Sequence, residues 1–224
     1  MSAPQTEFSY VQTRRGWLHV ARCGDAGTRD APPVLLLHQT PRSVAEYHAV
    51  LPLLAARWQA IALDTPGFGA SPALPEGASI EGWADAAAAL LEALGIERAH
   101  VVGHHTGGVV ALELAAARPE RVGRLVLSST PWIDAAERVR RAQRGAIDHV
   151  QPRDDGSHLT ELWQRRAPFY PASRPGLLHA FVLDALKVLD RVEEGHDAVT
   201  RYALDERIGL VRAPTLVLQA GADP

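Results

Sequence analysis

The sequence of 224 residues lacks several features that define large classes of protein. Its one cysteine, Cys23, excludes an internal disulfide and a cluster of thiolate metal ligands. No apolar run approaches the ~20 residues that cross a bilayer, and residues 1–7 lack the basic and apolar regions of a secretory signal. The net charge of -3 argues against nucleic acid or a membrane surface as the main partner. We therefore expect a cytoplasmic protein.

The sequence contains several short apolar runs, and most of them alternate with helical patterns. Continuous apolar runs suit parallel strands that are buried on both faces. Strands that alternate with helices favour right-handed crossovers and a mostly parallel sheet. The runs at 34–37, 59–63, 99–102, 124–128 and 214–219 are predicted strands of this kind, and 8–12 with 17–22 predict an antiparallel hairpin at the sheet edge.

Three segments between the predicted strands carry helix signals. Ser43 and the glutamate three residues later form a capping box, which predicts a helix over 43–56. Ser79 is the expected N-cap of a second helix, because apolar residues follow it at helical spacing. The segment 108–117 carries one charge, Glu113, and we expect this third helix to be buried nearly all round.

The alternation of strands and helices stops after the run at 124–128. The next eighty residues show helical patterns, at 134–150, 177–189 and 197–205, and no strong strand signal. A long helical insertion of this kind commonly forms a cap over the ends of the strands. We therefore predict an α/β core, made of residues 1–131 and 213–224, and a helical cap over 132–212.

The five residues from Gly103 to Gly107 read Gly-His-His-Thr-Gly and lie between a predicted strand and a predicted helix. This is the setting of the nucleophile elbow, G-x-S-x-G, which presents its middle residue on a sharp turn. Glycine at both ends leaves room for the chain to turn tightly. The middle residue is usually Ser, Cys or Asp, whereas this sequence has His105.

Taken with three further motifs, the elbow makes the sequence resemble the α/β-hydrolase superfamily. Within it, the chain is most similar to the capped members related to haloalkane dehalogenases, epoxide hydrolases and small-molecule esterases. The resemblance covers nearly the whole chain. It rests on 38–41 (His-Gln-Thr-Pro for H-G-x-P), 64–71 (D-x-P-G-x-G-x-S), 103–107 (the elbow) and 118–127 (the run into the family's sixth strand).

The resemblance implies a hydrolase of a small organic substrate, such as an ester or a lactone, that needs neither a metal nor a cofactor. Thr106 and Thr40 would each contribute a backbone N–H to an oxyanion hole, where such donors meet charge that develops in the transition state. Gln39 stands where the family has glycine. Its side-chain amide would either contact the substrate in the pocket or only fill the space that glycine leaves. His38 lies in the same loop, as part of the substrate site or as its hydrogen-bonded support.

The resemblance also assigns a position to the family's catalytic acid. In the family, the catalytic acid follows the next-to-last strand of the sheet. Asp223 stands at this position and would orient a histidine. The family places that histidine farther along the chain, together with a last strand and helix, whereas this sequence ends at Pro224. We therefore expect the sequence to be a fragment of a longer reading frame, with an exposed strand at the sheet edge.

Four interpretations of His105 are open on the sequence alone. The leading one is a general base that activates water or abstracts a proton from the substrate, since imidazole is a base near neutral pH. The second is a binding protein that has lost catalysis. The third is a metal site that His105 forms with His38 and His104. A simpler role for His104 is that of a hydrogen-bonded histidine beside the sheet. The fourth moves the nucleophile to Thr106.

The predicted cap adds candidate residues for the pocket roof. Its histidines are more often surface residues, although one of them can approach the pocket; they are His149, His158, His179 and His196. Its aromatic residues can line the pocket or pack in the core of the cap; they are Trp132, Trp163, Phe169 and Tyr170.

Overall fold

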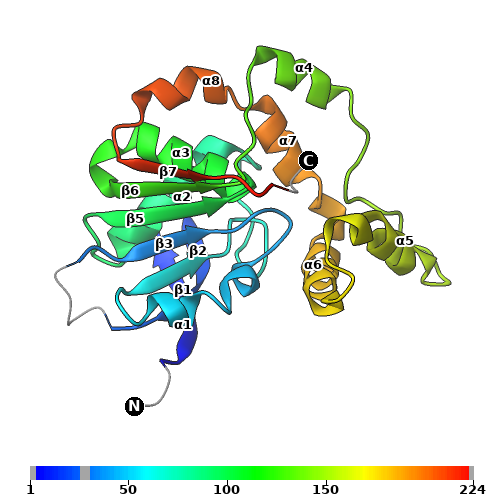
Figure 1. Cartoon of the computed structure of the whole chain (residues 1–224), viewed down its shortest axis with the longest axis horizontal. Coiled ribbons are helices and arrows are strands. Elements are labelled where there is room, and N and C mark those ends of the chain that lie inside the picture. The colour runs from blue at the N-terminus through cyan, green and yellow to red at the C-terminus, as the bar shows by residue number, and fades with distance from the viewer. Residues whose placement is uncertain (1–3, 26–30, 222–224) are drawn as a thin grey trace.

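The computed structural model describes residues 4–25 and 31–221, and its centre is one seven-stranded sheet (Figure 1). The strand order is β1-β2-β4-β3-β5-β6-β7. Antiparallel pairing joins β1 to β2 and β2 to β4, whereas all other neighbours are parallel. The strands are β1 (Thr6–Thr13), β2 (Gly16–Cys23), β3 (Val34–Leu37), β4 (Ala60–Leu63), β5 (Ala99–His104), β6 (Val122–Ser128) and β7 (Thr215–Leu218). The prediction of a mostly parallel sheet with a hairpin at its edge is confirmed.

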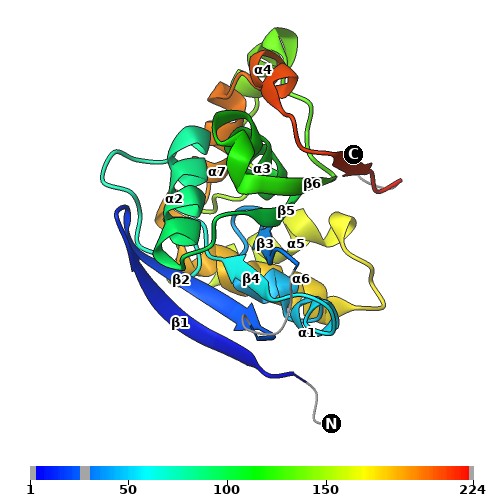
Figure 2. The same cartoon turned by 90° about the vertical axis from the view of Figure 1, so that its left-hand side faces the viewer.

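Helices cover both faces of the sheet (Figure 2). The larger apolar core lies between one face and two helices, α2 (Ile80–Ala93) and α3 (Thr106–Ala117). Eleven of the twelve residues of α3 are buried, as its single charge predicted. A smaller core on the other face includes Leu51 of the short helix α1 (Leu51–Leu54).

The helix predicted over 43–56 is wrong in extent. The structure has a 3-10 turn at Val44–Tyr47 and then only the single turn of α1. Ser43 caps the 3-10 turn by accepting from the Ala45 N–H at 3.2 Å. The capping box does not close, because the Glu46 carboxylate accepts from the Gln39 N–H at 3.2 Å.

Residues 132–212 contain helices and no strand, as expected. The helices are α4 (Ala135–Ala142), α5 (Ser157–Arg166), α6 (Pro175–Lys187), α7 (Glu194–Arg201) and α8 (Leu204–Arg207). The single helix predicted over 134–150 is wrong, since α4 ends at Ala142. The N–H groups of residues 147–149 instead donate to one carboxylate oxygen of Glu193, which turns the chain toward α7.

The far edge of the sheet is formed by β7, which pairs only with β6 among the strands described. All four of its residues are exposed, including Val217 at 65%. The prediction of an exposed last strand is confirmed for the described part of the chain. No helix within that part combines the length and the apolar character that crossing a membrane requires.

Candidate active site

His105 occupies the sharp turn between β5 and α3, with the strained backbone that the motif predicts. Its φ of 50° and ψ of -115° lie in a region that side chains other than glycine rarely adopt. Backbone hydrogen bonds hold this conformation. The His105 N–H donates to the Ser128 carbonyl at 2.9 Å, and the His105 carbonyl accepts from the Gly108 N–H at 2.9 Å.

The two glycines of the motif are required by close contacts between backbones. A Cβ on Gly103 would lie 2.2 Å from the carbonyl oxygen of Gly107. A Cβ on Gly107 would lie 2.0 Å from the carbonyl oxygen of Leu37, on the neighbouring strand. Both distances are far below van der Waals contact, so that this turn can form only with glycine at these positions.

The turn opens into a cavity of about 410 Å³ between the sheet and the helical segment. This volume suits a small organic molecule. The core contributes Gln39, Thr40, His104, His105, Thr106, Ser129, Pro131 and Ala220 to its wall, and the helical segment contributes Arg141, Arg166, Phe169, Tyr170, Phe181, His196 and Val199. The structure thus brings four of the six predicted site residues together.

Thr40 and Thr106, the predicted oxyanion-hole residues, lie in contact at the floor of the cavity. Their hydroxyl oxygens are 3.0 Å apart and form a buried hydrogen bond. Thr106 is also the first residue of α3, where backbone N–H groups have no acceptor within the helix and attract negative charge. The hydroxyl of Thr106 is therefore engaged by Thr40, which weakens its candidacy as a displaced nucleophile.

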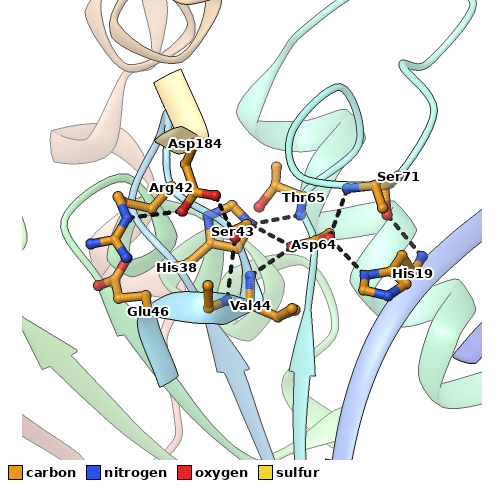
Figure 3. Close-up of polar contacts among 12 residues, drawn as sticks. His19, His38, Arg42, Ser43, Val44, Glu46, Asp64, Thr65, Ser71 and Asp184 are labelled. Carbon is orange, nitrogen blue, oxygen red and sulfur yellow. Dashed lines mark hydrogen bonds and ion pairs between the residues drawn. The ribbon is translucent and has the colours of Figure 1, made fainter. Parts of the chain in front are cut away.

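His38 does not line the cavity, so that of its two predicted roles the structure shows the hydrogen-bonded support and not the place beside the substrate. It is fully buried and supports the loop (Figure 3). Its Nδ1 donates to the Gln39 carbonyl at 2.8 Å, and its Nε2 accepts from the Thr65 N–H at 2.9 Å. Burial lowers the pKa of His38, although the nearby carboxylate of Asp64 opposes this. The ring is neutral because its Nε2 accepts a hydrogen bond.

Asp64 fastens the loop after β3 to the loop after β4. Its carboxylate accepts from the Val44 N–H at 2.6 Å and from the Ala70 N–H at 2.8 Å (Figure 3). The same carboxylate meets Nδ1 of His19 at 2.7 Å. The D-x-P-G-x-G-x-S motif thus acts here by positioning the loop that carries Thr40.

His104 lies beside the elbow and faces the neighbouring strand. Its Nδ1 is 3.2 Å from the hydroxyl of Ser128, and its ring packs edge-on against His105 with centroids 5.4 Å apart. The expected hydrogen bond beside the sheet is present, although His104 also reaches the cavity wall. Among the residues described, no group of three metal-binding side chains is arranged to hold an ion.

A cluster in the helical segment adds three residues that the sequence did not assign to the site. His196 of α7 and Arg166 of α5 line the cavity, and both bind the fully buried carboxylate of Asp148. Burial favours a higher pKa for Asp148, but hydrogen bonds from His196 and Arg166 outweigh it and hold the pKa below its usual value. The only signal in the sequence was that one histidine of the segment can approach the pocket.

Asp223, the predicted catalytic acid, lies outside the described residues. Its role stays a prediction.

Comparisons with known proteins agree with this fold. The model of the alpha/beta hydrolase fold family matches residues 32–224. The chain belongs to the α/β-hydrolase fold family.

Particular relatives include a putative carbamate hydrolase RutD from Variovorax paradoxus, which is 33% identical over 88% of this chain and 76% of its own length. A pimeloyl-[acyl-carrier protein] methyl ester esterase from Aeromonas hydrophila is 37% identical over 47% of this chain and 41% of its own. The enol-lactonase from Burkholderia xenovorans has the same fold, with a TM-score of 0.70 and 20% identity over 93% of this chain and 80% of its own. Matches to several other curated hydrolases span less than half of their length.

Proposed function

We propose that the protein hydrolyses a small organic substrate, such as an ester or a lactone, with His105 as the general base. The observation that carries the proposal is the position of His105: it stands at the nucleophile elbow, on the wall of a cavity, next to the N-terminus of α3. The similar proteins named as esterase, carbamate hydrolase and enol-lactonase support hydrolysis of a small substrate.

The chemistry follows from replacing a nucleophilic oxygen by an imidazole. A serine in this position needs a separate base and forms an ester with the substrate. An imidazole can instead take a proton from water directly, so that water adds to the carbonyl carbon in one step. The N–H groups of Thr40 and Thr106 would then stabilise the oxyanion, an arrangement that the 3.0 Å contact between their hydroxyls supports.

The helical segment 132–212 would act as the cap of this site. Its aromatic side chains Phe169, Tyr170 and Phe181 contribute apolar surface to the wall of the cavity. An apolar roof excludes water and strengthens the electrostatic interactions beneath it. The core of residues 1–131 and 213–224 would then supply the base and the oxyanion donors.

The test is turnover of a panel of esters, lactones, epoxides and haloalkanes by the wild type and by the His105→Ala and His105→Ser variants. We expect ester or lactone hydrolysis by the wild type and a loss of about 100-fold or more in both variants. His179→Ala, which changes an exposed histidine of α6, is the matched control. Undiminished turnover in both variants at position 105 would reject the proposal.

A second candidate function is ligand binding without catalysis. The observation in its favour is the elbow itself, which lacks Ser, Cys and Asp at its middle position while the cavity is retained. Binding of esters or lactones measured by calorimetry, with no turnover across the whole panel, would establish this alternative.

A further inference from the structure

We infer that His196, carried by the helical segment, is the general acid of the site and that Asp148 is its positioning residue. This inference rests on the proposed hydrolysis and adds the group that protonates the leaving oxygen. His196 lines the same cavity as His105 but comes from α7, about ninety positions later in the chain.

The contact between His196 and Asp148 has the geometry of a histidine oriented by a carboxylate. The Nε2 atom of His196 lies 2.9 Å from Oδ2 of Asp148. That bond fixes the ring and leaves Nδ1 as the nitrogen that can exchange a proton with a bound molecule.

Asp148 is itself held firmly in the interior. It is fully buried, and Arg166 binds both of its oxygens, with Nη2 at 2.5 Å from Oδ2. The guanidinium of Arg166 packs 4.9 Å from the ring centre of Phe181. A carboxylate fixed from one side by Arg166 can therefore orient His196 without moving.

The packing of α7 places His196 next to the oxyanion loop. The preceding residue, Gly195, is buried, and a Cβ on it would lie 1.9 Å from Oγ1 of Thr40. The backbone of α7 thus passes directly over Thr40, which itself contacts Thr106. His196 is carried by the segment of the cap that touches the predicted oxyanion hole.

Charged and titratable groups surround His196 on the cavity wall and on α7. Among the described residues, no carboxylate lines the cavity wall. The titratable groups that line the wall are arginines and histidines, together with Tyr170. Arg141 of α4 is paired with Glu137 at 2.7 Å, and the elbow contributes His104 and His105. On α7 itself lie Glu193, at its N-cap, Glu194 and Asp197. Asp148 is the carboxylate in direct contact with the His196 ring.

The proposed reaction balances with these two histidines and one water. His105 removes a proton from water, and the oxygen of that water forms the new bond to the carbonyl carbon. The tetrahedral intermediate then collapses with cleavage of the bond to the leaving oxygen. The imidazolium of His196 gives that oxygen a proton, so that an alcohol leaves and the acid remains. His105 releases its proton to solvent, from which His196 takes one back.

The test compares two esters that share an acyl group but differ in leaving group. 4-Nitrophenolate leaves without a proton, whereas ethoxide needs one. We expect His196→Gln to lower kcat/KM about 100-fold for ethyl acetate and less than about 5-fold for 4-nitrophenyl acetate. Asp148→Asn should show the same selective loss and a changed pH profile for ethyl acetate. His179→Gln is the matched control, and the side chain of His196 is 22% exposed, so its replacement leaves the core intact.

The outcomes separate this inference from the proposed function. An equal loss on both esters in His196→Gln, or no loss, overturns the assignment of the acid while the role of His105 stands. Undiminished hydrolysis of both esters by His105→Ala overturns the proposed base, and a selective loss in His196→Gln still supports the acid. A wild type that hydrolyses no ester or lactone of the panel overturns both, whereas a wild type that hydrolyses only lactones and shows no loss of lactone turnover in His196→Gln overturns the assignment of the acid alone.

Discussion

The carboxyl group of Glu46 should make the stability of the protein depend on pH. Burial raises the pKa of Glu46 to about 8, although Arg42 and the Gln39 N–H oppose the shift. A folded state that holds the proton more tightly than the unfolded chain is stabilised at low pH. This contribution is complete below the ordinary pKa of 4.5 and is lost as the pH rises through about 8.

The size of the effect follows from the two pKa values. A shift from 4.5 to about 8 is about 3.5 units, and at about 1.4 kcal/mol per unit its upper limit is about 5 kcal/mol. We expect at least about 2 kcal/mol of this in the folded protein. Glu46→Gln keeps an oxygen for the Gln39 N–H but cannot ionise, so the variant should not suffer this loss at high pH.

The assay is urea unfolding at pH 5.5 and pH 9, followed by circular dichroism. We expect the free energy of unfolding of the wild type to fall by at least about 2 kcal/mol more than that of Glu46→Gln between the two pH values. Glu97→Gln, which changes an exposed glutamate, should behave as the wild type. Equal falls in wild type and Glu46→Gln would refute the reasoning.

Three further substitutions test contacts at and near the site. Gly107→Ala should prevent folding or lower Tm by more than about 10 °C in a thermal scan, because its Cβ would lie 2.0 Å from the Leu37 carbonyl. Tyr202→Phe should cost about 1–2 kcal/mol in urea unfolding, because it removes the 2.6 Å hydrogen bond to the buried carboxylate of Glu113. Thr106→Val should cost about 1 kcal/mol and retain ester hydrolysis, since the role assigned to Thr106 belongs to its backbone. An unchanged Tm in Gly107→Ala would contradict the close backbone contact. An unchanged free energy of unfolding in Tyr202→Phe would contradict the hydrogen bond to Glu113. Abolished hydrolysis in folded Thr106→Val would contradict the role assigned to the backbone of Thr106.

The sheet could be predicted from the sequence because its strands are short and apolar throughout. The run at 34–37 became β3 without a change of bounds, and the run at 59–63 became β4 with one residue fewer. The N-cap at Ser79 also marked the start of α2 correctly, with its hydroxyl 3.1 Å from the Gly82 N–H. These signals are local, so the sequence alone carries them.

The errors occurred where a distant residue decides the local conformation. The pattern over 134–150 is helical, but α4 ends at Ala142, and the N–H groups of residues 147–149 bind Glu193 in place of helix carbonyls. The capping box at Ser43 failed because Glu46 accepts from Gln39 instead. Neither contact can be predicted from the hydrophobic periodicity of the sequence.

The part of the candidate site that lies in one local motif could be predicted from the sequence, whereas the part that joins distant residues could not. The elbow is one continuous motif, so the turn at His105 and its neighbours Thr106 and Gly107 could be placed from the sequence. The pair of His196 and Asp148 joins residues 48 positions apart in a segment of irregular loops. No spacing rule connects them, and only the folded chain shows that Asp148 binds His196 where His196 lines the cavity.

The measurement that tests the central claim most directly is kcat/KM of purified His105→Ala relative to the wild type on the best ester or lactone substrate. The imidazole at the elbow is assigned the proton transfer, so we predict a fall of at least about 100-fold in a variant with an unchanged circular dichroism spectrum. Equal values of kcat/KM for variant and wild type would contradict the claim.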